Sequence, residues 1–423
     1  MMELKEYMFS ELYEMSSGIS STKEQAGHGA PFASFSTVFN NYVLPDELPD
    51  LMDTSEREQI TYSIKKGDIL ITRTSETLDE LAMSSVALKD YPKATYSGFV
   101  KRLRPLQTDV TYDKFMAFYL RSPYFRKIVD NNTNMTLRAS FNEDIFSYIT
   151  ILLPEYSVQK KIGDFLFTVF EKIQNNNELI EKLEQQAQVM YDYWFSQFDF
   201  PNEQGLPYRT NGGEMEWNNL IRREIPKGWK VSTLDACGEF KNGINYEKDY
   251  IGNTCAKIVN VRNISNTSYF IMAHDLDDIY LDKEEVDKYV IEENDILIAR
   301  SSIPGATRLM YSGFENCIYC GFVIRYRVYK KELKNYLFYK CKEAENTLKV
   351  QSGGTILKNV SQDTLKPVNV ILPNDDEVIT SFNQKIDVLF GKIDELNLES
   401  HKLQYLLDYL TPLLVNGQVI LDK

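Results

Sequence analysis

Apolar residues recur in alternating steps of four and three along two stretches of the chain, about Val158 to Phe195 and Val378 to Leu414. In the first stretch the positions on this pattern are Ile162, Leu166, Val169, Ile173, Asn176, Ile180, Leu183, Ala187, Met190 and Trp194. In the second they are Phe382, Ile386, Leu389, Ile393, Leu396, Ser400, Leu403, Leu407, Leu410 and Leu414. An alternation held this long is typical of a coiled-coil seam, so each stretch is predicted to form one helix roughly 50 Å long.

Each predicted helix has one polar residue in its seam, Asn176 in the first and Ser400 in the second. Buried polar seam residues tend to fix register and orientation at a cost in stability. Two arrangements fit the pattern: each helix packs on a globular domain of its own, or the two helices pair with each other. We favour pairing because the stripes are narrow and the two stretches have matching lengths.

Four segments of the first half of the chain return in the same order in the second half. The pairs are Tyr62–Arg73 with Tyr289–Arg300, Ser97–Val100 with Cys320–Val323, Thr136–Pro154 with Thr355–Pro373, and Phe170–Ile173 with Phe390–Ile393. Repetition of several segments in one order indicates a duplicated unit, here one that ends each time in a long helix. The predicted fold is therefore α+β, with two pseudo-repeated mixed α/β domains separated by two long helices that form an antiparallel coiled coil.

The predicted boundaries are 1–157 for the first domain, 158–197 for the first helix, 198–229 for a crossover, 230–375 for the second domain and 376–416 for the second helix. Within the first domain, Gly18–Pro31 is predicted to be an ordered surface loop. A turn at Lys66–Asp68 precedes a strand, and Phe115–Val129 reads as a helix broken near Pro123. The crossover has aromatic anchors among its Pro and Gly residues, which favours a packed segment over a floppy linker.

Composition narrows the class of protein. The chain has 423 residues, of which 43% are hydrophobic, and a net charge of −14. No run of 18 apolar residues exists, and the charged start lacks the apolar region of a signal peptide. The five cysteines have no framework spacing, which indicates reduced thiols. We expect a cytoplasmic protein that does not enter a membrane.

No catalytic constellation is evident in the sequence. It lacks a GxxxxGK[ST] phosphate loop, a GxGxxG turn after a strand, and the Asn-Pro-Pro-aromatic run that amino-methyltransferases use. The three histidines are far apart, and the single Cys317-x-x-Cys320 has no second pair with which to form a zinc site. The chain alone is therefore expected to be non-catalytic, with no catalytic residue, no metal site and no cofactor.

Local charge differs from the total. Lys89–Arg138 holds ten Lys or Arg against four Asp, and Arg300–Lys366 holds twelve Lys or Arg against five acidic residues. The two windows occupy equivalent places in the repeats, and contact with phosphates requires a local basic surface only. Because charge fluctuates in any window of this size, the recurrence is what favours a polyanion surface.

These features together resemble the specificity (S) subunit of type I restriction-modification enzymes. The residues that carry the resemblance are the two heptad helices, Tyr191–Phe195 with Glu224–Trp229 in the crossover, the recurring strands after Asp68 and Asp295, the Leu-Pro before each helix, and Gly353–Thr355 with Asn359–Ser361. The likeness covers almost the whole chain. The first copy departs from it at Thr136–Asn142, which lacks the Gly-Gly-Thr form.

The resemblance implies a DNA reader in which each domain recognises one half of an asymmetric, bipartite sequence. The two helices would pair antiparallel as a ruler between the half-sites. The implied partners are double-stranded DNA, two modification (methyltransferase) subunits, which would use S-adenosylmethionine, and restriction subunits in the full complex.

Two other functions fit the sequence less well: a coiled-coil scaffold that binds protein partners without DNA, and an enzyme with an unrecognised site. The predicted DNA-contacting residues lie in the basic windows and at the ends of the repeated strand. They are Arg73, Lys101, Arg102, Arg138, Arg300, Arg308, Lys349 and Lys358. Arg73 and Arg300 each follow the repeated Asp-Ile-Leu-Ile strand, where loops carry function.

Overall fold

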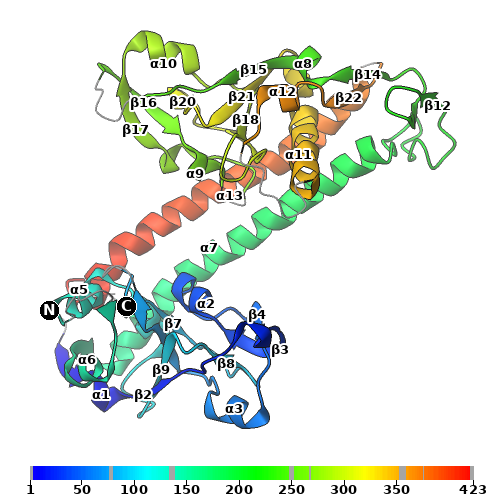
Figure 1. The fold of residues 1–423 in the computed structure, drawn as a ribbon. Helices are drawn as coiled ribbons and strands as arrows, with labels where there is room; N and C mark the ends of the chain where they lie inside the picture. The colour runs from blue at the N-terminus through cyan, green and yellow to red at the C-terminus, as the bar shows by residue number, and fades with distance from the viewer. Residues whose placement is uncertain are drawn as a thin grey trace. The chain divides into compact units, whose positions relative to one another are not determined.

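The computed structural model describes residues 3–75, 80–132, 139–246, 252–265, 268–351, 359–374 and 376–419. It divides into two compact units, shown with their elements labelled in Figure 1. Unit 1 contains Met1–Gln174 and His401–Lys423, and unit 2 contains Asn175–Ser400. Unit 1 therefore includes the C-terminal end of the chain. No helix within the described ranges has the length and apolar character needed to cross a membrane.

Unit 1 is built on a four-stranded antiparallel sheet in the order β2-β9-β5-β7, with a three-stranded sheet β4-β3-β8 and the pairs β1–β11 and β6–β10. Its strands are β1 Leu4–Met8, β2 Tyr13–Ser17, β3 Ala26–Ala33, β4 Asp50–Met52, β5 Ile69–Thr72, β6 Thr74–Ser75, β7 Ser84–Val86, β8 Thr95–Tyr96, β9 Val100–Pro105, β10 Ala139–Ser140 and β11 Thr150–Pro154. Its short helices are α1 Phe9–Leu12, η1 Lys23–Gln25, α2 Phe35–Asn40, α3 Glu56–Thr61, α4 Asp113–Tyr119, α5 Pro123–Asn132 and α6 Glu143–Tyr148.

Unit 2 repeats this topology. The sheet order β15-β21-β18-β19 matches β2-β9-β5-β7, β17-β16-β20 matches β4-β3-β8, and β14–β22 matches β1–β11. The strands are β12 Met215–Asn218, β13 Arg223–Pro226, β14 Lys230–Thr233, β15 Gly238–Asn242, β16 Thr254–Val259, β17 Asp277–Leu281, β18 Asp295–Ala299, β19 Thr307–Leu309, β20 Cys317–Tyr319, β21 Val323–Val328 and β22 Asn369–Leu372. The short helices are α8 Leu234–Cys237, α9 Val261–Ile264, η3 Ala273–Asp275, α10 Lys283–Tyr289, η4 Lys331–Leu333, α11 Lys334–Gln351 and α12 Gln362–Leu365. The predicted duplication is confirmed.

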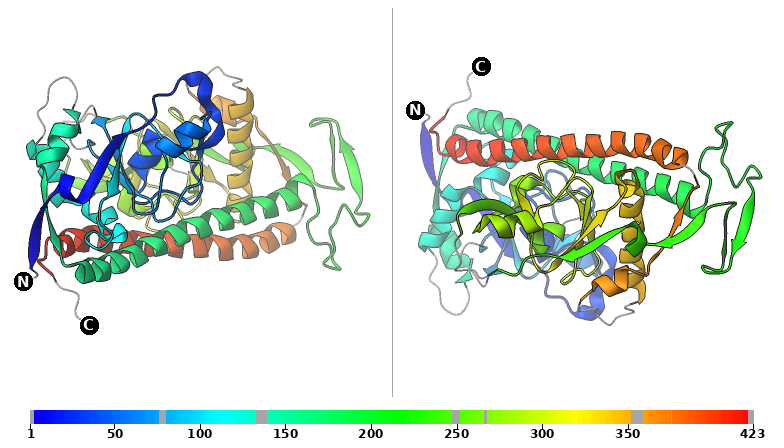
Figure 2. Two further views of the ribbon diagram at one scale, coloured as in Figure 1. Left: turned by 90° about the horizontal axis from the view of Figure 1, so that it is seen from below. Right: turned by 90° about the horizontal axis from the view of Figure 1, so that it is seen from above.

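The two long helices are α7, Tyr156–Tyr191, and α13, Glu377–Val415, and they lie side by side and antiparallel in each unit (Figures 1 and 2). In unit 1 the first half of α7 shares a core with the second half of α13 through Ile162, Leu166, Ile173, Leu407 and Leu414. In unit 2 the second half of α7 shares a core with the first half of α13 through Ile180, Ala187, Phe382, Ile386, Phe390, Ile393 and Leu396. Val169, Leu183, Leu389 and Leu403 pack on the same two cores. Pairing and packing on a globular domain therefore both occur.

The two polar seam residues meet. Asn176 is 2% exposed, and its side-chain amide donates to Ser400 Oγ at 3.3 Å and to the Glu399 carboxylate at 2.8 Å. A shift of either helix by one turn would bury Asn176 against apolar neighbours without an acceptor, which is costly. This polar layer therefore fixes the register of the helix pair in unit 2.

A buried carboxylate opens the central strand of each unit. Asp68 precedes β5 and binds the Arg104 guanidinium through two hydrogen bonds of 2.8 and 2.6 Å. In unit 2, Asp295 binds Arg327 through two hydrogen bonds of 2.7 Å. Each carboxylate also accepts a backbone N–H three residues upstream, which closes the turn before the strand. The repeated Asp of the Asp-Ile-Leu-Ile segment is thus a structural residue.

The local predictions had mixed outcomes. The helix break near Pro123 is confirmed, since α4 ends at Tyr119 and α5 begins at Pro123. The interpretation of Gly18–Pro31 as a loop was wrong for its second half, where β3 pairs with β4. The glycines there serve an irregularity in the strand register between Ala26 and Ala30, not a loop.

The crossover is packed, as predicted. Phe198, Phe200 and Trp229 are buried in the unit 2 core, with Phe200 stacked on Trp229 at 5.1 Å between ring centroids. Between these anchors, β12 and β13 form an antiparallel hairpin, drawn in green at the right of both views in Figure 2. Anchors at both ends hold the segment against unit 2.

Replacing Asp295 with Ala should lower the free energy of unfolding of unit 2 by about 1.5–3 kcal/mol, because the partly buried Arg327 loses two charge-assisted hydrogen bonds and keeps only Glu292 and the Val290 carbonyl as partners. Lys331→Ala is the matched control, since Lys331 pairs with Glu293 at an exposed site and such pairs contribute about 0–1 kcal/mol. Denaturant unfolding of the two variants measures the difference. Equal, small effects would contradict the structural role given to Asp295.

Candidate nucleic-acid interface

The structure places Arg73 and Arg300 at equivalent positions. Arg73 is the residue after β5 and Arg300 is the residue after β18. The backbone N–H of Arg73 donates to Phe99 O at 2.8 Å, and that of Arg300 donates to Phe322 O at 2.9 Å. Each Arg therefore lies directly opposite a Phe, one residue beyond the paired ends of the strands.

Arg73 and Arg300 differ in how their side chains are held. Arg73 is exposed, whereas Arg300 is half-buried and donates from Nη1 to Gly321 O at 2.8 Å. The carbonyl of each Arg accepts a backbone N–H at 2.8 Å. The donor is Phe141, just before α6, in unit 1 and Val360, just before α12, in unit 2. The two residues that the sequence repeat paired therefore occupy the same position in the two units.

The repeated segments Ser97–Val100 and Cys320–Val323 form the same turn in their units. The Val100 N–H donates to Ser97 O at 2.9 Å, and the Val323 N–H donates to Cys320 O at 2.8 Å. The turn is hydrogen-bonded to a neighbouring segment: the N–H groups of Gly98 and Gly321 donate at 2.7 Å to the carbonyls of Ile19 and Ile244. The third residue of each turn is the Phe opposite the Arg.

Glycines make this close approach possible. A Cβ added to Gly18 would lie 2.1 Å from Ser97 O, and one added to the equivalent Gly243 would lie 2.2 Å from Cys320 O. Any other residue at either position would push the turn away from the sheet. In each unit, the glycine thus allows the backbone of the turn that carries Phe99 or Phe322 to pack directly on the neighbouring segment.

Three predicted DNA-contacting residues are buried within their own units. Lys101 is 5% exposed and its ammonium lies 2.8 Å from Ser17 Oγ, while Arg102 is 6% exposed and donates to Ser63 O at 2.7 Å. Arg308 is also 6% exposed and donates to Thr307 O at 2.8 Å. Burial lowers the pKa of Arg308, opposed by the nearby carboxylates of Glu345 and Glu184. These side chains serve the fold, and we exclude them from the candidate interface.

The remaining predicted contacts were Arg138, Lys349 and Lys358. Arg138 and Lys358 lie outside the described residues, as does the Gly353–Thr355 segment. The backbone of Lys349 belongs to α11, but its side chain is also outside what the structure describes. These three positions stay predictions.

Many of the cations in the two basic windows, Lys89–Arg138 and Arg300–Lys366, do not present a free positive charge at the surface. Arg104 and Arg327 are held by the buried aspartates, Arg325 pairs with Glu239, and Lys331 pairs with Glu293. Arg121 is turned inward, where it donates to four backbone carbonyls. Counting charges along the chain therefore overestimates the cationic surface, because many of these cations have acidic or carbonyl partners nearby.

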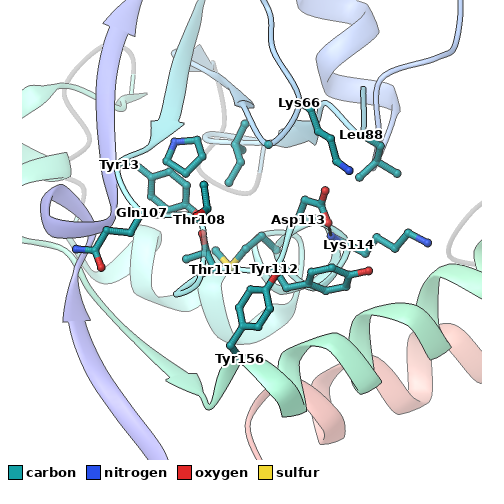
Figure 3. A pocket seen from close by; sticks show the side chains of 14 residues that line it. Tyr13, Lys66, Leu88, Gln107, Thr108, Thr111, Tyr112, Asp113, Lys114 and Tyr156 are labelled. Atoms are coloured by element: carbon teal, nitrogen blue, oxygen red, sulfur yellow. Dashed lines mark hydrogen bonds between the residues drawn. The ribbon is translucent and has the colours of Figure 1, made fainter. Parts of the chain in front are cut away.

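Unit 1 has a hollow of about 360 Å³ beside the turn that precedes β5 (Figure 3). Tyr13, Tyr112 and Tyr156 line it, together with Lys66 and Asp113. The Tyr112 hydroxyl donates to Asp164 at 2.6 Å. In the repeat, Glu293 stands where unit 1 has Lys66, so the two units differ in charge at this turn.

Within the described ranges, no group of three or more His, Cys, Asp or Glu side chains is placed to hold a metal ion. Cys317 and Cys320 are buried, with Cys317 in β20 and Cys320 immediately after it. Burial raises the pKa of the Cys317 thiol to about 11, which keeps it protonated and unreactive at neutral pH.

Comparison with known proteins gives the same division of the chain. The model of the type I restriction modification DNA specificity domain matches twice, at residues 5–185 and 226–406. This chain belongs to that family. Each match covers one globular domain together with most of the long helix that follows it, so the family's repeat and the structural duplication coincide.

Relatives within the type I restriction-modification family support this assignment over the whole chain. The specificity subunit of the type I restriction enzyme HindI from Haemophilus influenzae is 20% identical over 92% of this chain and 94% of its own length. The specificity subunit of the enzyme MjaIX from Methanocaldococcus jannaschii is 28% identical over 47% of this chain and 41% of its own length. The solved S subunit from M. genitalium has the same fold, with a TM-score of 0.58 and 13% identity over 100% of this chain and 97% of that one.

Two exposed residues beside the candidate arginines, Phe99 and Phe322, were not among the residues predicted from the sequence. The signal was available, because Ser97–Val100 and Cys320–Val323 share Gly-Phe-Val and recur in order. Their exposure was not visible in the sequence, since phenylalanine is also a common residue of both cores.

The environment of Arg308 generates a pH prediction. Glu184 on α7 is 8% exposed, and burial raises its pKa to about 7, although it accepts the Tyr269 N–H at 2.5 Å. Above pH 4.5 the unfolded chain has lost this proton while the folded chain keeps it up to about pH 7. The free energy of unfolding should therefore fall as pH rises through this window, and Glu184→Gln should remove that part of the fall.

Thermal unfolding midpoints between pH 5 and pH 8 measure the effect. Glu178→Gln is the control, because Glu178 lies on the same helix with a 68% exposed side chain. A pH dependence that is the same in Glu184→Gln as in the unchanged protein would contradict the assignment.

Proposed function

We propose that this chain is the DNA-recognition subunit of a type I restriction-modification system and reads an asymmetric, bipartite DNA sequence. The observation that carries the proposal is the presence of two topologically equivalent units in one chain, each matched by the DNA specificity domain. A protein with two related reading units binds DNA at two places along the duplex, and the spacing follows from geometry. Each unit would read one half-site.

Asymmetry of the target is supported by differences between the units. At the turn before the central strand, Lys66 of unit 1 corresponds to Glu293 of unit 2, and Arg73 is exposed whereas Arg300 is half-buried. Unit 1 has α4 and α5 where unit 2 has the single longer helix α11. Shared scaffold with different surface chemistry favours two different half-sites.

The chain would act with catalytic partners. Its relatives carry the name of specificity subunits of restriction enzymes, which supports assembly with other subunits of such an enzyme. In our proposal these are two modification subunits that use S-adenosylmethionine, and restriction subunits in the full complex. The chain itself would be non-catalytic and would work in the cytoplasm. The paired α7 and α13 would set the distance between the half-sites.

A coiled-coil scaffold without DNA binding is the competing function. The equivalent Arg73 and Arg300 beside solvent-exposed phenylalanines favour a nucleic-acid surface over a scaffold alone. The DNA-recognition subunit and the scaffold both require a pair of long helices. Only a DNA-recognition subunit predicts that a single change at a strand end alters a methylation pattern.

Arg300→Ala should change recognition in one half-site only, and Arg73→Ala in the other only. A base contact would cost about 1–3 kcal/mol and relax one position, whereas a phosphate contact would weaken binding to all sequences. Methylation-motif maps of cells that express each variant with the modification subunits measure this. Equal disturbance of both half-sites by Arg300→Ala, with the fold intact, would contradict two independent readers.

Adding one heptad to each helix should lengthen the gap between the half-sites. The insertions belong between Gln174 and Asn175 in α7 and between Ser400 and His401 in α13, where the two units divide. Seven residues add about 10 Å of helix, which corresponds to about three base pairs. Motif mapping should show the longer gap with unchanged half-sites, and an unchanged gap would rule out the ruler.

A further inference from the structure

Two phenylalanines are left in solvent at equivalent positions. Phe99 is 64% exposed and Phe322 is 61% exposed, and no other of the 23 phenylalanines, all of which lie within the described ranges, is exposed to this degree. Burying a Phe side chain contributes roughly 1.5–3 kcal/mol, so a chain that exposes two forgoes that stabilisation twice. Scattered exposed residues need no explanation, but the same residue exposed at the same place in both repeats does.

The fold holds the backbone that carries these side chains in place. Each Phe is the third residue of a turn closed by a backbone hydrogen bond, and a glycine under the turn makes room for the close approach of the two backbones. The turn then leads directly into the central strands β9 and β21. A turn on such a support loses little backbone freedom when its side chain binds, which favours a contact of defined geometry.

An arginine lies opposite each Phe in the backbone register. Arg73 and Arg300 occupy the positions directly across from Phe99 and Phe322, and side chains of residues opposite one another on antiparallel strands share a face, with Cβ atoms about 4.5–5.5 Å apart. An arginine and a phenylalanine at neighbouring positions match a ligand that offers apolar faces next to anions. Stacked bases beside their phosphates have this chemistry, with one phosphate on each strand for about every 3.4 Å of helix axis.

We propose that Phe99 and Phe322 are DNA wedges: each ring packs against a base-pair step of its half-site and partly unstacks it, while Arg73 or Arg300 holds the adjacent phosphate. Apolar side chains inserted at base steps open and bend duplexes in other proteins. The inference rests on the proposed function and adds to it the kind of contact each unit makes. It also assigns part of the specificity to the deformability of the sequence, since flexible steps cost less to unstack.

The alternative binding partner of Phe99 and Phe322 is a protein subunit of the same assembly. The adjacent arginine at both sites favours DNA over an apolar protein surface. The presence of one ring in each unit also matches one half-site for each unit.

The test uses this chain assembled with its modification subunits, bound to a duplex that carries its mapped target. The variants are Phe99→Ala and Phe322→Ala. The controls are Leu106→Ala and Tyr329→Ala, because these residues are 56% and 67% exposed and follow the opposite ends of the same strands β9 and β21. Each duplex carries 2-aminopurine at one base step, which fluoresces more strongly when it is unstacked.

The unchanged complex should raise the fluorescence at one step in each half-site. Phe322→Ala should abolish the rise in one half-site only, weaken binding about tenfold, and leave the slope of log affinity against log salt unchanged. Arg300→Ala should instead reduce that slope by about 0.9, because it removes a phosphate contact. Phe322→Trp, which keeps an aromatic ring, should retain both binding and the fluorescence rise, and the controls should behave as the unchanged chain.

Three results would overturn the wedge: no fluorescence rise at any step with the unchanged complex, Phe variants that bind and unstack like the unchanged complex, or Phe variants that bind DNA normally but no longer assemble with the modification subunits. The last result would assign the rings to a protein contact. Failure of the unchanged complex to recognise any bipartite target would overturn the proposed function itself, and the wedge with it.

Discussion

The need to cover the apolar stripe of each long helix determines the organisation of this chain. A single helix with a narrow seam cannot bury it alone, and α7 and α13 each bury one half of their seam in unit 1 and the other half in unit 2. Unit 1 therefore contains residues 401–423, although more than two hundred residues separate them from the rest of that unit. Each repeat is completed by half of the other repeat's helix, so neither domain is independent of the pair.

The helix pairing, the duplication and the polar seam layer could be predicted from the sequence because they depend on periodicity. A 4,3 alternation restricts a helix to few arrangements, and Asn176 and Ser400 lie only one step apart in the two patterns, near the middle of each stretch. The turn at Gly67, which has φ of 87°, and the helix break near Pro123 followed from the backbone limits of those two residue types.

The candidate site was only partly predictable, because burial of charged residues is decided by tertiary partners. Lys101 and Arg102 read as surface cations, yet side-chain and backbone oxygens hold them inside unit 1. Arg73 and Arg300 were found because they follow a repeated strand, a local feature. Phe99 and Phe322 were missed because nothing local distinguishes an exposed Phe from a core Phe, and only the fixed turn reveals the difference.

The equivalence of the two units connects fold to function. The same sheet order, the same Asp–Arg pair and the same turn appear twice, so the scaffold that presents Arg73 with Phe99 also presents Arg300 with Phe322. Around this shared scaffold, residues such as Lys66 and Glu293 differ. A duplicated frame with divergent surface residues is suited to reading two unlike sequences at a set separation.

The most direct measurement of this account is a genome-wide map of methylated bases in cells that express this chain with its modification subunits and no other methyltransferase. The account predicts one motif made of two different half-sites separated by a gap of fixed length and unspecified sequence. A contiguous motif, two identical half-sites, or a gap of variable length would contradict it.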